Sequence, residues 1–356
     1  MIRNQTCIRC VNDKTVKKIS FTPEGLCSHC TCFDRYREKL RDRTRLAKLF
    51  ADRMNRAGEY DYDAAVGFSG GKDSTYVLYQ LVKTHRLKVK AFTLDNGFMS
   101  RESREKIDRL VAELGVEHEY VQCDMDLLRQ MYAHITSRYL SPCIACSFLG
   151  YAVMINYASK INARVCIHGR SPYQMMRGLS DSHEDVFRPL IDAGLQDGEV
   201  DLDALYGGIL DKIDRLVDPK LAGKIKDTLL RDTVTNGYRD FVAYFLYHPY
   251  DQKQIVDHLQ ENTSWRVESE EEHFDCRIHH GALYLKDLVA RRAHLMPEYS
   301  AMINFGAMDK ATACQKLEQR VDESLAKEEL KEFCRYAGIS YPLLMLKANL
   351  YAKRWW

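Results

Sequence analysis

The strongest chemical signal in the sequence is a glycine-rich hexapeptide that follows a predicted buried strand over 63–68 and precedes a predicted helix ending near Leu81. It consists of Ser69, Gly70, Gly71, Lys72, Asp73 and Ser74. The order strand, glycine turn and helix presents backbone N–H groups and a helix N-terminus to an anion. The lysine adds a positive charge for a phosphate, the two serines can donate hydroxyls, and the aspartate is expected to hold Mg²⁺ directly or through water. The segment therefore predicts a nucleotide-phosphate site rather than a plain tight turn.

This hexapeptide resembles the signature of the PP-loop ATP pyrophosphatase superfamily. The resemblance implies ATP and Mg²⁺ as cofactors, cleavage between the α- and β-phosphates, and adenylation of an oxygen on the substrate. A nitrogen or sulfur nucleophile then displaces AMP. It also implies that Asp95, after a second predicted strand over 89–94, contacts the nucleoside, and that Gly169 lies at the nucleotide. The alternative for Asp95 is a solvated strand end.

Five cysteines near the N-terminus have the spacing of a metal site. Cys7-x-x-Cys10 and Cys27-x-x-Cys30 are separated by sixteen residues, and two such pairs can close a tetrahedral Cys₄ site around Zn²⁺. Residues 1–33 hold too few apolar side chains for a core, so a structural zinc would substitute for one. Cys32 is an alternative to Cys30 as the fourth ligand, and scattered structural thiols are the plain alternative to a metal.

A second pair, Cys143 and Cys146, precedes a predicted helix over 148–161, a strand over 165–167 and the sequence His168-Gly169-Arg170. This order resembles that of the tRNA 2-thiolation enzymes of the PP-loop superfamily. The resemblance implies that both cysteines and a distant third one, Cys276, hold a [4Fe–4S] cluster with one iron open to sulfide. It also implies a tRNA base or a small metabolite as acceptor, and sulfide or a cysteine desulfurase as sulfur donor.

Three alternatives stay open at this pair. Cys166 competes with Cys276 as the third ligand, although its apolar strand suggests a packed thiol. Cys143 and Cys146 can instead form a catalytic disulfide or persulfide, or hold zinc, or be inert. The tRNA 2-thiolation enzymes usually carry an acidic pair where this chain has Arg170, Ser171 and Pro172. The departure leaves the acceptor open; Arg170 is expected to hold a phosphate or carboxylate, or to form a surface ion pair.

The cysteine module from Cys7 to Cys30, followed by the hexapeptide, also resembles N-acetyl sugar amidotransferases of surface-polysaccharide assembly. This resemblance implies a second function, amide transfer to a sugar with ammonia from a partner glutaminase. That reaction does not need Cys143 and Cys146. A third function, non-enzymatic zinc and nucleotide binding, does not account for the intact hexapeptide.

Strands alternating with helices must position these residues, and they predict an α/β fold with a doubly wound parallel sheet. The resemblance specifies it as similar to adenine nucleotide alpha hydrolases. We expect a zinc-ribbon-like module over 1–33, a linking helix over 34–60 and a catalytic domain over 61–190. A wholly helical insertion over 191–245, the end of the catalytic domain over 246–280 and a helical region over 281–356 follow. The helical parts are expected to form a substrate lid or the surface of a homodimer.

Composition sets the remaining limits. The chain has 356 residues, of which 46% are hydrophobic and 29% charged, and a formal net charge of +2, so no whole-molecule charge argues for nucleic acid. No signal peptide begins the sequence, and no stretch approaches the roughly 18 apolar residues of a membrane helix. We therefore expect a cytoplasmic protein without a membrane partner. The twelve cysteines then favour metal or redox chemistry over disulfides.

Overall fold

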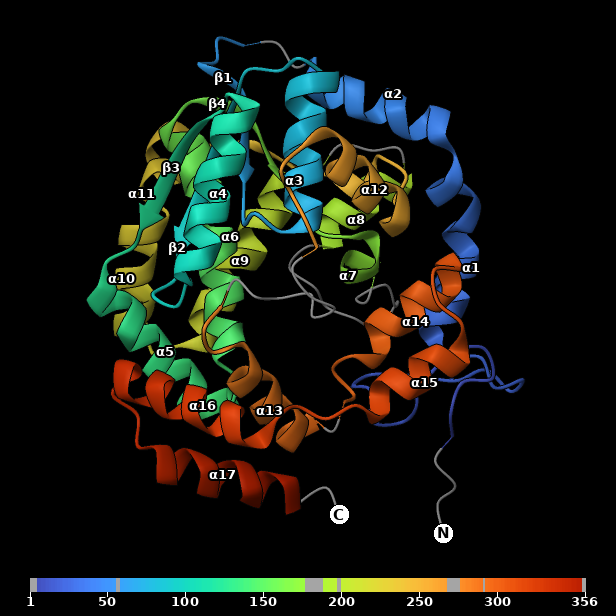
Figure 1. The fold of residues 1–356 in the computed structure, drawn as a ribbon, viewed down its shortest axis with the longest axis vertical. Coiled ribbons are helices and arrows are strands. Elements are labelled where there is room, and N and C mark those ends of the chain that lie inside the picture. The colour runs from blue at the N-terminus through green and yellow to red at the C-terminus, as the bar shows by residue number, and fades with distance from the viewer. Residues whose placement is uncertain are drawn as a thin grey trace.

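A parallel five-stranded sheet forms the centre of the computed structural model (Figure 1). The structure describes residues 5–55, 58–176, 188–196, 200–267, 276–290 and 292–353. The strand order is β3-β2-β1-β4-β5, and all neighbours are parallel. The strands are β1 Tyr62–Gly67, β2 Val89–Asp95, β3 Glu117–Gln122, β4 Ala163–His168 and β5 Asp240–Ala243. The predicted α/β class with a doubly wound parallel sheet is confirmed.

Helices cover both faces of this sheet because successive strand residues point to opposite sides. Ala64 and Val66 of β1 belong to one apolar cluster and Ala65 to the other. The first cluster packs against α3 Lys72–Tyr79 with its π-helical extension Gln80–Thr84, α4 Arg101–Leu114 and α12 Gln252–Asn262. The second packs against α5 Met125–Tyr139, α6 Pro142–Lys160, α9 Leu202–Leu216 and α10 Pro219–Leu229.

The strand order reverses between β1 and β4. The chain leaves β1 through α3 toward β2, whereas β4 pairs with β1 on the other side. Ligands of such sheets bind beyond the carboxyl ends of the strands at this point. The hexapeptide directly follows β1 and therefore lies there.

The remaining helices surround these layers. The predicted single linking helix is two helices, α1 Ser28–Arg41 and α2 Arg43–Met54, which meet at Asp42; its side chain accepts the Arg45 N–H and so caps α2. After β4 come α7 Pro172–Met176, α8 Arg188–Gln196 and α11 Arg231–Asn236. The last helices are α13 His279–Ala290, α14 Met296–Phe305, α15 Lys310–Glu318, α16 Glu323–Ala337 and α17 Tyr341–Lys353. Gly306, predicted to separate two helices, ends α14 with a φ of +79°.

The prediction that 191–245 is wholly helical is wrong at its end. Phe241 lies in β5, which pairs with β4, and Tyr244 begins a short 3-10 turn over Tyr244–Leu246. Four aromatic residues of this edge strand and of the turn after it are buried in the core: Phe241, Tyr244, Phe245 and Tyr247. The sheet thus includes residues from the end of the predicted insertion. The boundaries between the predicted segments stay a prediction.

Helix α6 corrects a second expectation. By length and composition alone, α6 is long and apolar enough to cross a membrane. The sequence analysis expected no stretch of this kind. In the fold 61% of this apolar stretch is buried, and the helix packs against elements that include β1, β4, α5 and α11. Such burial is typical of the core helix of a globular protein.

Candidate functional site

The hexapeptide forms a compact turn held by its own side chains. The hydroxyls of Ser69 and Ser74 lie 3.2 Å apart, and the Ser74 hydroxyl also accepts the Ser69 N–H at 3.3 Å. Gly70 has a φ of +72°, which favours glycine. Lys72 begins α3, and Gly71 is its N-cap without a capping side chain. The first N–H groups of α3 are therefore available to an anion, as the sequence predicts.

Lys72 and Asp73 point into a shared polar contact with Tyr250, a residue from the loop before α12. The Lys72 ammonium donates to the Tyr250 hydroxyl at 2.8 Å, and this hydroxyl donates to Asp73 Oδ1 at 3.0 Å. The ammonium also lies 3.3 Å from Asp73 Oδ1. Only 18% of the lysine side chain and 22% of the aspartate side chain are exposed. One hydroxyl therefore orients both charged groups of the predicted phosphate site.

Gly169 lies against the first turn of α3. A Cβ atom at this position would meet the Asp73 carbonyl oxygen at 3.1 Å and Val77 Cγ2 at 3.1 Å. The loop after β4 can approach the hexapeptide this closely only because it has no side chain there. The structure thus brings Gly169 to the predicted nucleotide site.

Asp95 ends β2 and shapes the turn that follows. Its Oδ1 accepts the Gly97 N–H at 3.0 Å, and its Oδ2 accepts a hydrogen bond from Arg104 at 3.1 Å. Asp95 is therefore an anchored carboxylate rather than a solvated strand end. The next residue, Asn96, donates its side-chain amide to the Cys146 sulfur at 3.3 Å.

Cys143, Cys146 and Cys276 line one cavity of about 1460 Å³, which Tyr250 also lines. The two paired cysteines lie in the first turns of α6, not in a loop before it, because α6 begins at Pro142. Cys276 forms an isolated antiparallel bridge with Met99, and the Arg277 N–H donates to the Phe98 carbonyl at 2.9 Å. The third cysteine is thereby fixed to the segment after β2.

Tyr132 of α5 lies beside two of these sulfurs. Burial, then the Cys146 and Cys276 thiols, raise the pKa of Tyr132 well above its usual value. Its hydroxyl donates to the Asn96 carbonyl at 3.2 Å. The three cysteine sulfurs do not all lie within 4.8 Å of one another. A single tetrahedral ion needs sulfurs about 3.8 Å apart, from bonds of about 2.3 Å, so the arrangement does not suit one such ion held by all three cysteines.

Two other residues singled out by the sequence have different surroundings. Cys166 is buried in β4, where burial raises the pKa of its thiol, and its sulfur lies 3.5 Å from the Met154 carbonyl. It does not line the cavity. Arg170 does: it stacks over Tyr151 at 4.8 Å and donates to the Ser147 hydroxyl at 3.3 Å. Its backbone N–H donates to His168 Nδ1, and burial lowers the pKa of His168 to about 3.

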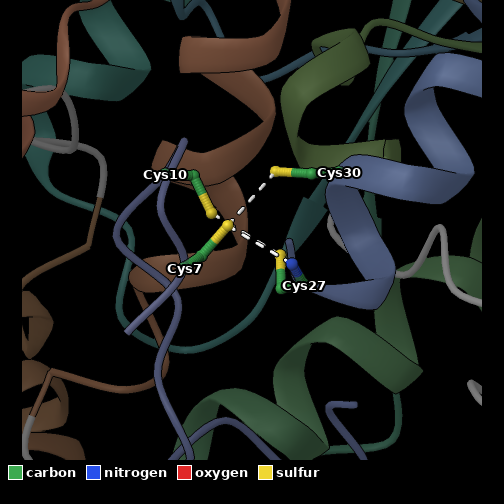
Figure 2. Close-up of side chains that lie close together, drawn as sticks. All are labelled: Cys7, Cys10, Cys27 and Cys30. Carbon is green, nitrogen blue, oxygen red and sulfur yellow. Dashed lines mark hydrogen bonds between the residues drawn. The ribbon is translucent and has the colours of Figure 1, made fainter. Parts of the chain in front are cut away.

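The N-terminal module brings Cys7, Cys10, Cys27 and Cys30 together, as Figure 2 shows. Their sulfurs all lie within 4.8 Å, with Cys7 and Cys30 at 3.9 Å and Cys10 and Cys27 at 3.6 Å. Both distances are close to the spacing of about 3.8 Å that tetrahedral zinc requires. Cys32 instead packs in the sheet's apolar cluster. The structure therefore places Cys30, not Cys32, in the four-sulfur group.

Amide groups surround these sulfurs, as is usual for metal-bound thiolates. The Cys27 N–H donates to Cys7 at 3.3 Å, and the Asn12 N–H donates to Cys10 at 3.4 Å. Hydrogen bonds with Cys10 and then Cys30 lower the pKa of the Cys27 thiol. The four residues thus have the donor set and the surroundings of a thiolate metal site.

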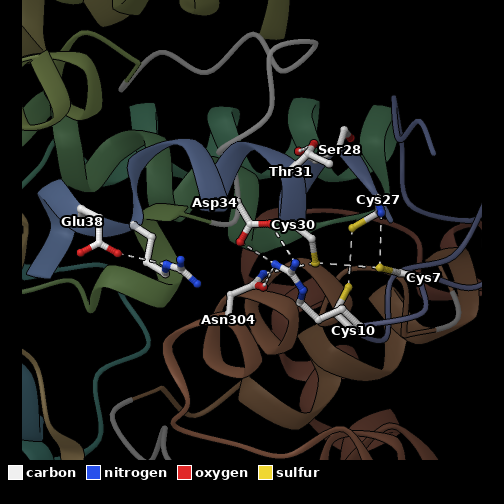
Figure 3. Close-up of polar contacts among 11 residues, drawn as sticks. Cys7, Cys10, Cys27, Ser28, Cys30, Thr31, Asp34, Glu38 and Asn304 are labelled. Atoms are coloured by element: carbon white, nitrogen blue, oxygen red, sulfur yellow. Dashed lines mark hydrogen bonds and ion pairs between the residues drawn. The ribbon is translucent and has the colours of Figure 1, made fainter. Parts of the chain in front are cut away.

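Helix α14, which is far from this module in the sequence, packs against it (Figure 3). Its Asn304 donates to the Cys30 sulfur at 3.4 Å and accepts a hydrogen bond from Arg9, which also pairs with Asp34 at 2.7 Å. Lys310 donates to the Cys7 carbonyl at 2.7 Å. Because Tyr299 and Phe305 of α14 also line the large cavity, the module supports one wall of it.

Sequence reasoning gave no role to several residues of this site. Tyr250, Asn96 and Tyr132 act through contacts between segments far apart in the chain, which no local pattern encodes. For Tyr250, the one signal in the sequence was the position of this tyrosine between a strand and helix α12.

Comparisons with known proteins agree with this geometry. The family model described as asparagine synthase matches residues 45–334. The uncharacterized protein MJ1638 of Methanocaldococcus jannaschii is 29% identical over 107 residues, which are 30% of this chain. The chain spans 39% of the length of that relative.

Two solved structures are similar at low sequence identity. The U34-tRNA thiolase NcsA from Methanococcus maripaludis with its [4Fe-4S] cluster is 15% identical, with a TM-score of 0.36 over 91% of both chains. The NH3-dependent NAD synthetase from Campylobacter jejuni, in complex with nitrate, is 14% identical, with a TM-score of 0.32. That match covers 56% of this chain and 95% of the synthetase.

The family match covers more than half of the chain and includes the whole hexapeptide. Together with the strand, turn and helix around Lys72, it confirms the predicted PP-loop relationship. The chain therefore belongs to the asparagine synthase family of PP-loop ATP pyrophosphatase-type proteins.

Proposed function

We propose that this enzyme adenylates an acceptor with ATP and then replaces the activated oxygen by sulfur. The observation that carries the proposal is one cavity that is lined by Cys143, Cys146, Cys276 and by Tyr250, the hydroxyl partner of Lys72 and Asp73. A nucleotide site whose partner residue Tyr250 lines the wall of the cysteine-lined cavity suits two successive steps on one substrate. The acceptor is a tRNA base or a small metabolite, and sulfide or a cysteine desulfurase supplies the sulfur.

In the first step the chain holds the triphosphate and stabilises its charge. The N–H groups at the start of α3 and the Lys72 ammonium bind phosphate oxygens, and Asp73 would hold Mg²⁺, which would neutralise phosphate charge. The acceptor oxygen attacks the α-phosphorus, and pyrophosphate leaves. In the second step sulfur attacks the adenylated carbon, and AMP leaves with the oxygen. Asp95 and Gly169 border the nucleotide in this proposal.

The three cavity cysteines fit a [4Fe–4S] cluster as ligands. All three are partly exposed, and their sulfurs are too widely spaced for one tetrahedral ion. A cluster with three thiolates leaves one iron open, which would supply the site for an activated sulfide. Asn96 stabilises a thiolate at Cys146 through its amide, and the N-terminus of α6 stabilises negative charge there. We further propose that the four N-terminal sulfurs hold a structural Zn²⁺.

No disulfide forms among the cysteines, all of which lie in the described part of the chain. Reduced thiols suit a reducing compartment, so we place the enzyme in the cytoplasm. A homodimer stays a prediction.

The decisive experiment is anaerobic purification with iron, sulfide and zinc analysis. We expect a brown protein with broad visible absorption, and each of Cys143→Ser, Cys146→Ser and Cys276→Ser is expected to lose most of its iron and its sulfur transfer. Cys314→Ser is the matched control, because Cys314 is exposed and does not line the cavity. A colourless, iron-free and fully active wild-type protein would contradict the proposal.

The nucleotide half is tested separately with Lys72→Ala and Asp73→Ala. Neither side chain belongs to an apolar cluster, so the variants are expected to fold normally. Pyrophosphate release from ATP should fall at least a hundredfold, since Lys72 would stabilise the leaving pyrophosphate and Asp73 would hold the Mg²⁺ that does so (roughly 10²–10³ for one such group). Turnover like that of the wild type in either variant would move the nucleotide site elsewhere.

The family description keeps amide transfer as the second candidate function. In that reaction ammonia from a partner glutaminase attacks the adenylated acceptor, which would be an N-acetyl sugar. The three cysteine variants would then keep their activity with ammonia, and the anaerobic protein would contain no iron. If a persulfide carries the sulfur instead, Cys276→Ser is tolerated while Cys143→Ser and Cys146→Ser are inactive.

A further inference from the structure

The cavity has a cationic wall that neither the nucleotide site nor the three cysteines use. It is formed by α13, by the segment before α14 and by the end of α15, and its charged and imidazole members are Lys286, Arg292, His294, Lys316 and Arg320. All five line the same cavity as Cys276.

Arg292 is the central residue of this wall. It is 9% exposed, and its Nε atom is buried and makes no hydrogen bond within the described residues. The same atom lies 3.2 Å from Asp287 Oδ2, an ion pair without hydrogen-bond geometry. Its backbone has a φ of +66°, an uncommon conformation for a residue with a Cβ atom. A buried guanidinium with unused donors, held in such a conformation, indicates a binding role.

The charges around Arg292 do not cancel. Asp287 is the carboxylate of the cluster, and Arg292, Arg320 and Lys286 all lie near enough to lower its pKa, although burial raises that pKa overall. Three cations against one carboxylate leave a surplus of two positive charges. His294 Nδ1 lies 3.8 Å from Asp287 Oδ1 and adds a further donor on the cavity side.

The acidic residues of the cavity are already engaged elsewhere. Asp251, Asp309 and Asp322 each cap the N-terminus of a helix by accepting backbone N–H groups. Glu298 lies in the first turn of α14, where the helix dipole stabilises a carboxylate. Within the described residues none of these four acids forms an ion pair with Arg292, whose carboxylate partner is Asp287.

We propose that Lys286, Arg292 and Arg320 form a binding site for a phosphate group of the acceptor, separate from the phosphates of ATP. A guanidinium binds phosphate oxygens through paired N–H groups, and a phosphate carries about the charge that this wall leaves unbalanced. Assigning the phosphate to the acceptor rests on the proposed function; the binding itself does not. The acceptor is then a phosphorylated small molecule or a nucleic acid.

The test measures binding without turnover. The hexapeptide is first saturated with Mg²⁺ and α,β-methylene-ATP, and calorimetry then follows inorganic phosphate, ribose 5-phosphate and a short single-stranded RNA. We expect phosphate to bind, and one of the other two to bind more tightly; the tighter probe identifies the source of the phosphate. Arg292→Gln is expected to weaken binding about tenfold or more, the loss of one hydrogen-bonded charge.

Arg320→Gln and Lys286→Gln provide the second line, because Arg320 is exposed and Lys286 half-buried, so their replacement does not threaten the fold. Each should weaken binding several-fold. Lys253→Gln is the matched control: it lines the same cavity, but it is 85% exposed and paired with Asp257 at 2.7 Å. No binding of any probe, or equal affinity in all four variants and the wild type, would overturn the proposal. Loss of sulfur transfer alone would contradict only the proposed function.

Discussion

The Tyr250 hydroxyl forms hydrogen bonds with both charged groups of the proposed nucleotide site. Tyr250 accepts from Lys72 at 2.8 Å and donates to Asp73 at 3.0 Å, while its ring packs 5.1 Å from Tyr173 and 4.8 Å from Phe245. The ring packing fixes the position of the hydroxyl, and the hydroxyl fixes both charges before the nucleotide arrives. Such preorganisation lowers the cost of binding and of reaction.

This arrangement makes a prediction for Tyr250→Phe. The variant keeps the ring contacts but loses both hydrogen bonds, so its stability should change by less than about 1.5 kcal/mol. We expect kcat/KM for ATP-dependent pyrophosphate release to fall about tenfold, the loss of one charged hydrogen bond. Steady-state kinetics and denaturant unfolding check both numbers. Unchanged kinetics would show that Tyr250 only packs.

At the scale of elements, the N-terminal segment and helix α14, which are far apart in the sequence, meet at the four-cysteine group. Helix α1 supplies Cys30, the loops before it supply the other sulfurs, and α14 supplies Asn304. The rings of Phe33 and Phe305 lie 5.0 Å apart, and Phe305 lies 5.6 Å from Tyr173, the neighbour of Tyr250. The N-terminal module thereby positions a cavity wall and a contact of the nucleotide site.

Metal removal should therefore act on the fold first. We expect one zinc per chain, which Cys7→Ser and Cys27→Ser each lose, with a lower free energy of unfolding and slower acceptor turnover. Metal analysis and thermal unfolding measure this. Cys32→Ser is the matched control, because Cys32 is equally buried but lies outside the sulfur group. A metal-free N-terminal segment that stays folded would contradict the prediction.

At the scale of the whole molecule, the C-terminal helices are part of the catalytic core. Phe333 of α16 is fully buried, and its ring lies 5.7 Å from Phe98 after β2 and 5.4 Å from Tyr132 of α5. The same contacts support the segment of Phe98 and Met99, to which Cys276 is bridged. The cysteine site thus depends on packing from helices near the end of the chain.

Phe333→Ala tests this dependence. The substitution leaves a cavity beside the rings of Phe98 and Tyr132, and we expect a loss of about 3–5 kcal/mol in the free energy of unfolding. Urea unfolding measures it. Anaerobic iron content should fall with the stability, because the segment that holds Cys276 loses its support. Leu343→Ala is the control, since Leu343 is 66% exposed; an equal loss there would show that burial of Phe333 is not the cause.

The sequence by itself determined the chemistry that acts within one local segment. The hexapeptide, the alternation of strands and helices and the Cys7, Cys10, Cys27 and Cys30 spacing are patterns that can be seen within short stretches of the sequence, and the four cysteines all lie within residues 7–30. Phosphate binding by a strand, turn and helix needs no distant residue, so a local pattern is sufficient to predict it.

Only the tertiary structure decided the rest. Phe241 reads as helical by its spacing, yet β5 forms because a free edge of β4 is there to pair with. Cys143 and Cys276 are 133 positions apart in the sequence, and they share a cavity because Cys276 pairs with Met99. Arg292 faces that cavity with unbalanced charge only because α13 and α15 converge there. Contacts between distant segments arise from packing the whole chain, and no spacing along the sequence encodes them.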